Sequence, residues 1–118
     1  MELTRTFYAE TDVDDNSGEN SKRYHLQYYL LQKEIMLEGI GFCTYGIEIV
    51  LFERNGGEDA NPEYSRVYDA FCTRKDAEEI MDRLVRNKVT PVHLMEVLQD
   101  TVGVGDLVNR ETSIQAIS

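Results

Sequence analysis

Carboxylates cluster near the N-terminus at a spacing that could bind calcium. Asp12, Asp14 and Asn16 occupy the first, third and fifth positions of a twelve-residue calcium loop. Such a loop also requires glycine at its sixth position and glutamate at its twelfth, where this chain has Ser17 and Arg23. No helix is predicted before the segment, so the pattern does not indicate a calcium site.

The cysteines and histidines are the other side chains that could bind a metal or attack a substrate. In an antiparallel meander, Cys43 and Cys72 lie at the same edge of the sheet, where a redox pair or two reduced, packed thiols are both possible. His25 is expected about 25 Å from Cys43, and His93 follows a helix about 20 Å long. Catalytic groups must lie within hydrogen-bond reach, so no catalytic, cofactor-binding or metal-binding residue is assigned.

Tyrosine is the remaining signal, because the chain has seven tyrosines and no tryptophan. Most of them lie on predicted strands and exceed what two helices can cover on one face of a sheet. Tyrosine is enriched in protein interfaces, although ordinary exposed strand residues would give the same pattern. We expect Tyr28 or Tyr29 to be partly exposed, or buried against another copy. The candidate interaction surface comprises Tyr24, Tyr28, Tyr29, Tyr64 and Tyr68.

The elements that position these side chains follow from a change of hydrophobic period at Thr73. Before it, apolar residues alternate over residues 44–53, as in a strand with one buried face. After it, they recur at the spacing of one stripe of a helix that ends near Lys88. This stripe comprises Ala77, Ile80, Met81, Leu84 and Val85.

Two further strands are predicted over residues 22–33 and 63–71, and Thr90-Pro91 is typical of the start of a second helix. The chain is therefore predicted to be α+β, with a three-stranded antiparallel meander sheet followed by two helices packed on one face. We expect residues 1–21 to form a mobile acidic arm, residues 22–103 the domain, and residues 104–118 a tail that could fray, add an edge strand or contact a second subunit. The predicted core comprises Ile47, Ile49, Leu51, Ile80, Leu84, Leu94 and Leu98.

The net charge of the chain limits the classes of partner that it can bind. A net charge of −10 and a pI near 4.5 disfavour nucleic acid and anionic membranes. The basic residues Arg83, Arg86 and Lys88 alternate with acids and indicate a solvated helix face. With two cysteines, no apolar run that could span a bilayer and no signal-peptide pattern, a cytoplasmic protein is expected.

Two short motifs carry a resemblance to a known family. Tyr45-Gly46-Ile47-Glu48-Ile49 and Thr90-Pro91-Val92-His93-Leu94 resemble a family of small, uncharacterised Firmicutes proteins classed as a domain of unknown function. The resemblance covers residues 24–102. It implies a bacterial cytosolic setting and no assigned activity, cofactor or catalytic residue.

These observations favour a non-catalytic protein-interaction module that associates with itself or a protein partner. The alternative is a small-molecule binding protein or an enzyme with a pocket between sheet and helices. A mass measurement in solution distinguishes the two, because a strict monomer with a polar-lined pocket favours the alternative.

Overall fold

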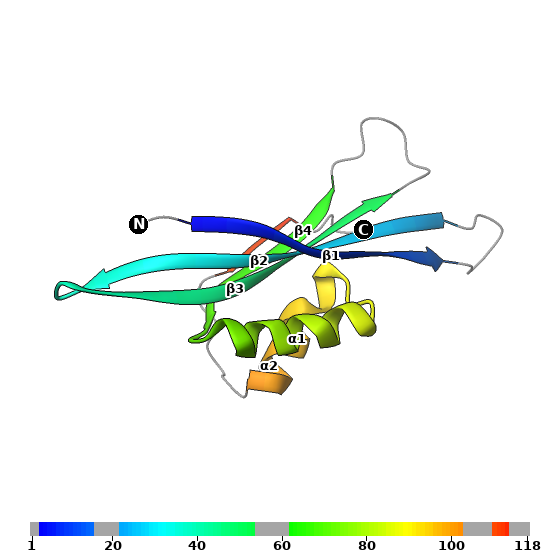
Figure 1. Cartoon of the computed structure of the whole chain (residues 1–118). Coiled ribbons are helices and arrows are strands. Elements are labelled where there is room, and N and C mark those ends of the chain that lie inside the picture. The colour runs from blue at the N-terminus through cyan, green and yellow to red at the C-terminus, as the bar shows by residue number, and fades with distance from the viewer. Residues whose placement is uncertain (1–2, 16–21, 54–61, 103–109, 114–118) are drawn as a thin grey trace.

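The computed structural model of the chain describes residues 3–15, 22–53, 62–102 and 110–113. Its antiparallel sheet has the strand order β1-β2-β3-β4-β5, and both helices lie against one face of it (Figure 1). The strands are β1 (Leu3–Asp15), β2 (Lys22–Leu37), β3 (Ile40–Glu53), β4 (Glu63–Phe71) and β5 (Arg110–Ser113). The helical elements are α1 (Arg74–Arg86), the short 3₁₀ helix η1 (Pro91–His93) and α2 (Leu94–Val102).

The α+β class, the meander order and the helices on one face are confirmed, but the prediction of three strands is wrong. The predicted strands correspond to β2, β3 and β4, and β1 and β5 extend the sheet on its two sides. Residues 3–15 are thus a strand and not an arm outside the sheet, while residues 16–21 lie outside the described part of the chain. The tail contributes β5, which is one of the three outcomes left open for it.

The strand β1 is stabilised by pairing that its own composition does not reveal. It pairs with β2 from Leu3 opposite Lys33 to Asp15 opposite Lys22, with a bulge between Phe7 and Ala9. Glu10, Asp12 and Asp14 alternate with Thr11 and Val13, so these three carboxylates share one face of the sheet. Pairing with β2, which is rich in apolar and basic residues, stabilises this carboxylate-rich strand. The stabilising contacts therefore come from residues distant in the sequence.

The β2–β3 hairpin is longer than predicted, because its turn is only two residues long. Glu38 and Gly39 have φ values of 51° and 78°, the sign required by the tight turns that match strand twist. The pairing therefore continues to Leu37 opposite Ile40. Beyond Lys33 on β2 and Tyr45 on β3, the described residues provide no further strand beside this ribbon.

The first helix begins as predicted at Thr73, whose side-chain oxygen accepts a hydrogen bond from the backbone N–H of Asp76 at 3.2 Å. The second start signal, Thr90-Pro91, opens η1, which leads directly into α2. Thr90 makes no side-chain capping bond there, so Pro91 with its fixed φ provides the start.

The core lies between the helices and the sheet. Six of the seven predicted core residues are buried, and Leu51 is partly buried at its edge. Leu26, Tyr28 and Leu30 of β2 point toward the helices, as their alternation predicted. The buried set that joins sheet and helices also includes Val67, Phe71, Ala77 and Met81.

A bulge in β4 passes close to the central strand. Tyr45 is opposite Phe71 and Ile47 is opposite Val67, so three residues of β4 lie across from Gly46 alone. Asp69 within this bulge has a φ of 56°. A Cβ atom on Gly46 would lie 2.0 Å from the carbonyl oxygen of Val67, so only glycine fits at this position.

Tyr28 is buried in the core and its hydroxyl donates a hydrogen bond to the carbonyl oxygen of Val89 at 2.9 Å. Changing Tyr28 to Phe leaves that carbonyl without its partner, and we expect a loss of about 1–3 kcal/mol in the free energy of unfolding. Urea denaturation at neutral pH measures it.

Burial also raises the pKa of Tyr28 above its usual value of 10.0. The unfolded chain then releases this proton at a lower pH than the folded chain, so the contribution to stability is complete below pH 10 and falls as the pH rises beyond it. We expect stability to decline less steeply above pH 10 in the Tyr28→Phe variant, measured by urea denaturation across that range. An unchanged slope would contradict this assignment.

Candidate functional site

The sheet face that points away from the helices carries most of the candidate residues, and we call it the open face (Figure 1). Strand pairing and the alternation of side chains assign residues to it. On β1 these are Leu3, Arg5, Phe7, Glu10, Asp12 and Asp14, and on β2 they are Arg23, His25, Gln27, Tyr29, Leu31, Lys33, Ile35 and Leu37. On β3 and β4 they are Ile40, Phe42, Thr44, Gly46, Glu48, Val50, Phe52, Tyr64 and Arg66.

The five tyrosines of the predicted interaction surface do not form one patch. Tyr24 and Tyr28 share the helix-covered face, where Tyr28 is buried and Tyr24 half-buried. Tyr29 and Tyr64 lie on the open face and are half-buried. Tyr68 is half-buried in the β4 bulge. Only Tyr29 and Tyr64 therefore remain candidates for a surface on the open face.

A buried carboxylate lies at the centre of the open face. Glu48 of β3 is fully buried, and its two carboxylate oxygens accept hydrogen bonds from the Nε atoms of Arg5 and Arg66. Each guanidinium also lies over a tyrosine ring: Arg5 is 3.5 Å from the centre of Tyr29, and Arg66 is 4.4 Å from that of Tyr64. These five residues form a continuous row across four strands, which we call the Glu48 network.

The Glu48 network orders the open face. A buried carboxylate is tolerated only when charged donors replace its water, and the two arginines provide them from strands on either side. The arginines remain partly exposed, so the outer surface of the network is cationic. Its geometry provides positioned charge and aromatic area, but no nucleophile.

Changing Glu48 to Gln is expected to reduce the free energy of unfolding by about 1.5–3 kcal/mol, because an amide offers one acceptor oxygen to two arginine donors. Urea denaturation measures this loss. The matched control is Glu10→Gln, which neutralises an exposed carboxylate of the same face and should change stability by about 0.5 kcal/mol or less. Equal effects of the two changes would show that burial of Glu48 contributes nothing.

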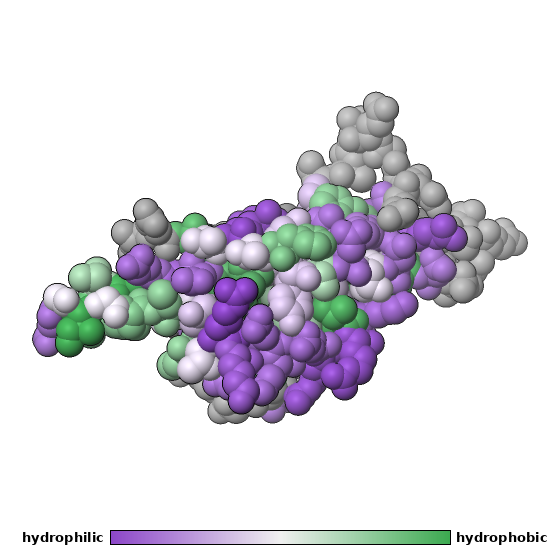
Figure 2. Space-filling view, in the orientation of Figure 1, coloured by the Kyte–Doolittle hydropathy of each residue, from purple (hydrophilic) through white to green (hydrophobic). Residues whose placement is uncertain are grey.

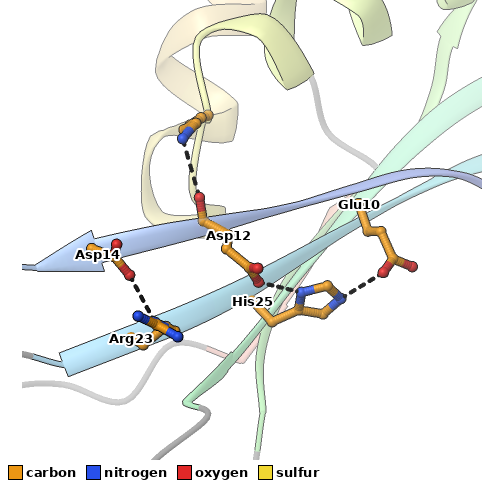
Figure 3. Close-up of polar contacts among 6 residues, drawn as sticks. Glu10, Asp12, Asp14, Arg23 and His25 are labelled. Carbon is orange, nitrogen blue, oxygen red and sulfur yellow. Dashed lines mark hydrogen bonds and ion pairs between the residues drawn. The ribbon is translucent and has the colours of Figure 1, made fainter.

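A second polar cluster joins β1 to β2 at the other end of the open face (Figure 3). The Nδ1 atom of His25 is 2.7 Å from a carboxylate oxygen of Asp12, and its Nε2 atom is 3.4 Å from one of Glu10. Arg23 donates to Asp14 at 3.1 Å, and Lys88 donates to the backbone oxygen of Asp12 at 3.2 Å. His25 lies on β2 with its side chain 13% exposed.

The chemistry open to this cluster is limited by its geometry. The carboxylates face opposite nitrogens of the imidazole, so they cannot converge on one metal ion with it. Within the described ranges, no group of three or more metal-ligating side chains is close enough to bind an ion. The described contacts therefore make this cluster a set of polar links between β1 and β2.

The two cysteines are free, with Cys43 half-buried and Cys72 exposed. The pairing of Tyr45 with Phe71 brings both to the same end of β3 and β4, in agreement with the meander order. Cys43 lies opposite Glu34, nine residues along β2 from His25, or about 30 Å. That distance separates the thiol from the imidazole.

The free end of the β2–β3 hairpin is apolar on its surface. Figure 2 shows hydrophobic residues gathered there, beyond the part of the sheet that the helices cover. Leu37, Ile40 and Phe42 share the open face and are 62%, 69% and 43% exposed, and Met36 on the opposite face is 64% exposed. We call these four residues the hairpin tip.

Sequence reasoning did not find the hairpin tip or the arginine partners of Glu48. The strands predicted over residues 22–33 and 44–53 leave residues 34–43 outside the sheet, although Ile35, Leu37, Ile40 and Phe42 fit two short paired strands. The arginines are separated from Glu48 by 43 and 18 residues. No local pattern could connect them without the position of β1.

Together, the fold and the open face define a small α+β protein with a helix-covered antiparallel sheet, an exposed hairpin and a buried carboxylate held by two arginines. The chain belongs to a family of unknown function, DUF6514, whose model matches residues 9–104. No curated protein and no solved structure gives a significant match. In the described ranges, no helix has both the length and the apolar character needed to cross a membrane.

Proposed function

We propose that this protein is a non-catalytic interaction module that associates with itself through the open face and the hairpin tip, in a bacterial cytoplasm. The observation that supports the proposal is the exposure of Leu37, Ile40 and Phe42 side by side on one face of a projecting ribbon. Contiguous exposed apolar surface of this kind is typical of interaction sites.

The structure of the ribbon adds a second reason. An isolated two-stranded hairpin is marginally stable in water, and the tip of this one has no described strand or helix packed against it. Two half-buried tyrosine rings, Tyr29 and Tyr64, and the exposed ring of Phe7 lie on the same face.

The test is the mass of the full chain in solution, measured by sedimentation as a function of concentration. We expect the unchanged chain to form a dimer or a larger assembly, and the double variant Leu37→Asp, Ile40→Asp to weaken that association at least tenfold. Two charges in a desolvated apolar contact cannot keep their hydration, which accounts for the loss.

The matched control is Val92→Asp, because Val92 of η1 is also an exposed apolar residue, at 55%, but lies on the helical side of the molecule. It should leave association unchanged. A strict monomer at all concentrations would overturn the proposal and favour a small-molecule site between sheet and helices.

A further inference from the structure

The described side chains of the open face carry nearly balanced charges. Its described residues include four basic side chains, Arg5, Arg23, Lys33 and Arg66, and four acidic ones, Glu10, Asp12, Asp14 and Glu48. Asp69 of the β4 bulge also reaches this face, 3.5 Å from Lys33. These nine side chains sum to −1, so two open faces meet with little net repulsion.

These charges are also segregated along the strands. The half at the level of β2 residues 29–33, toward the hairpin tip, holds Arg5, Lys33 and Arg66 together with Glu48 and Asp69. It carries a charge of +1, and we call it the basic half. The acidic half, at the level of β2 residues 23–27, holds Glu10, Asp12 and Asp14 together with Arg23 and carries a charge of −2. The centres of the two halves are six residues apart, or about 20 Å.

We infer that two copies of the chain pack open face to open face with their strands antiparallel, about a two-fold axis perpendicular to the strands. This inference rests on the proposed function and specifies its geometry. In that arrangement the basic half of each copy faces the acidic half of the other, so the same contact forms twice by symmetry. A parallel arrangement would place each half against its own kind.

The apolar residues of the face fit the same arrangement. Phe7 and Tyr29 lie at the edge of the basic half that borders the acidic half, near the axis, and their rings are in edge-to-face contact at 5.7 Å between centres. Each hairpin tip then extends toward the far end of the partner sheet, where Phe52 is 36% exposed. Two sheets stacked in this way form a sandwich with an aromatic centre and charged ends.

The test exchanges charges between the halves with two single variants, Lys33→Glu and Asp14→Lys, because the axis between the halves brings the level of Lys33 opposite the level of Asp14. In the antiparallel dimer, either variant alone places like charges opposite each other at two symmetric sites. We expect the dissociation constant of each homodimer to rise about tenfold. Mixed in equal amounts, the variants restore opposite charges at both sites, so native mass spectrometry with one variant isotopically labelled should find about nine-tenths heterodimer.

The outcomes separate this inference from the proposed function. A random mixture, with half of the dimers heterodimeric, would overturn the antiparallel arrangement while leaving self-association intact. Preferential pairing of Lys33→Glu with the unchanged chain would overturn it in favour of parallel packing. A monomeric unchanged chain would overturn both proposals, and thermal unfolding of each variant confirms that the fold is retained.

Discussion

Alanine in place of Gly46 is expected to destabilise the protein by about 3 kcal/mol or more, which is the upper range for overpacking. The added Cβ would lie 2.0 Å from the carbonyl oxygen of Val67 and 3.0 Å from the Cα atom of Tyr68. Both are backbone atoms of the β4 bulge, so no side-chain rotation can make room. The bulge or the central strand must shift, and the hydrogen bonds between β3 and β4 are lost in part.

Urea denaturation of the full chain measures this loss. The control is Gly41→Ala, where the nearest atom is the flexible side-chain sulfur of Met36 at 3.0 Å, and we expect a change below about 1 kcal/mol. Equal stability of the two variants would show that the bulge does not pass over Gly46 as described.

The second large effect is expected for Leu84→Ala, with a loss of about 2–5 kcal/mol in the free energy of unfolding. Leu84 of α1 is fully buried in the core between the helices and the sheet. Truncation removes its apolar contacts and leaves a cavity that the surrounding strands and helices cannot close.

The comparison variant is Val92→Ala, since Val92 is an exposed apolar residue of the helical region. Its expected change is about 0.5 kcal/mol or less. A Leu84→Ala variant as stable as the original chain would contradict the packing of α1 on the sheet.

The interfacial predictions are smaller in energy but more informative about function. The hairpin-tip variants test whether the apolar ribbon is covered by another copy, and the charge exchange tests how the copies are oriented. Because the Glu48 network lies between the tip and the acidic half, its loss should alter both stability and association. Glu48→Gln is therefore not a suitable variant for separating the two.

The sequence by itself determined those helices and strands that a local hydrophobic pattern predicts. The change of period at Thr73 predicted the start of α1, and the side-chain cap confirms it. The alternation of β2 predicted that Tyr28 and Leu30 share one face, and residues 63–71 match β4. In each case the information lies within a few residues along the chain, because helix stripes and strand faces repeat over short distances.

Only the tertiary structure decided what the carboxylates of the N-terminal segment do. The local composition of residues 3–15 predicted an acidic arm. The segment is a strand because it pairs with β2, and local composition does not reveal a pairing partner. The same long-range pairing brings Arg5 to Glu48 and Asp12 to His25. The tertiary structure also decided which face of the sheet the helices cover, so Tyr28 is buried beneath them while Tyr29 and Tyr64 lie on the open face.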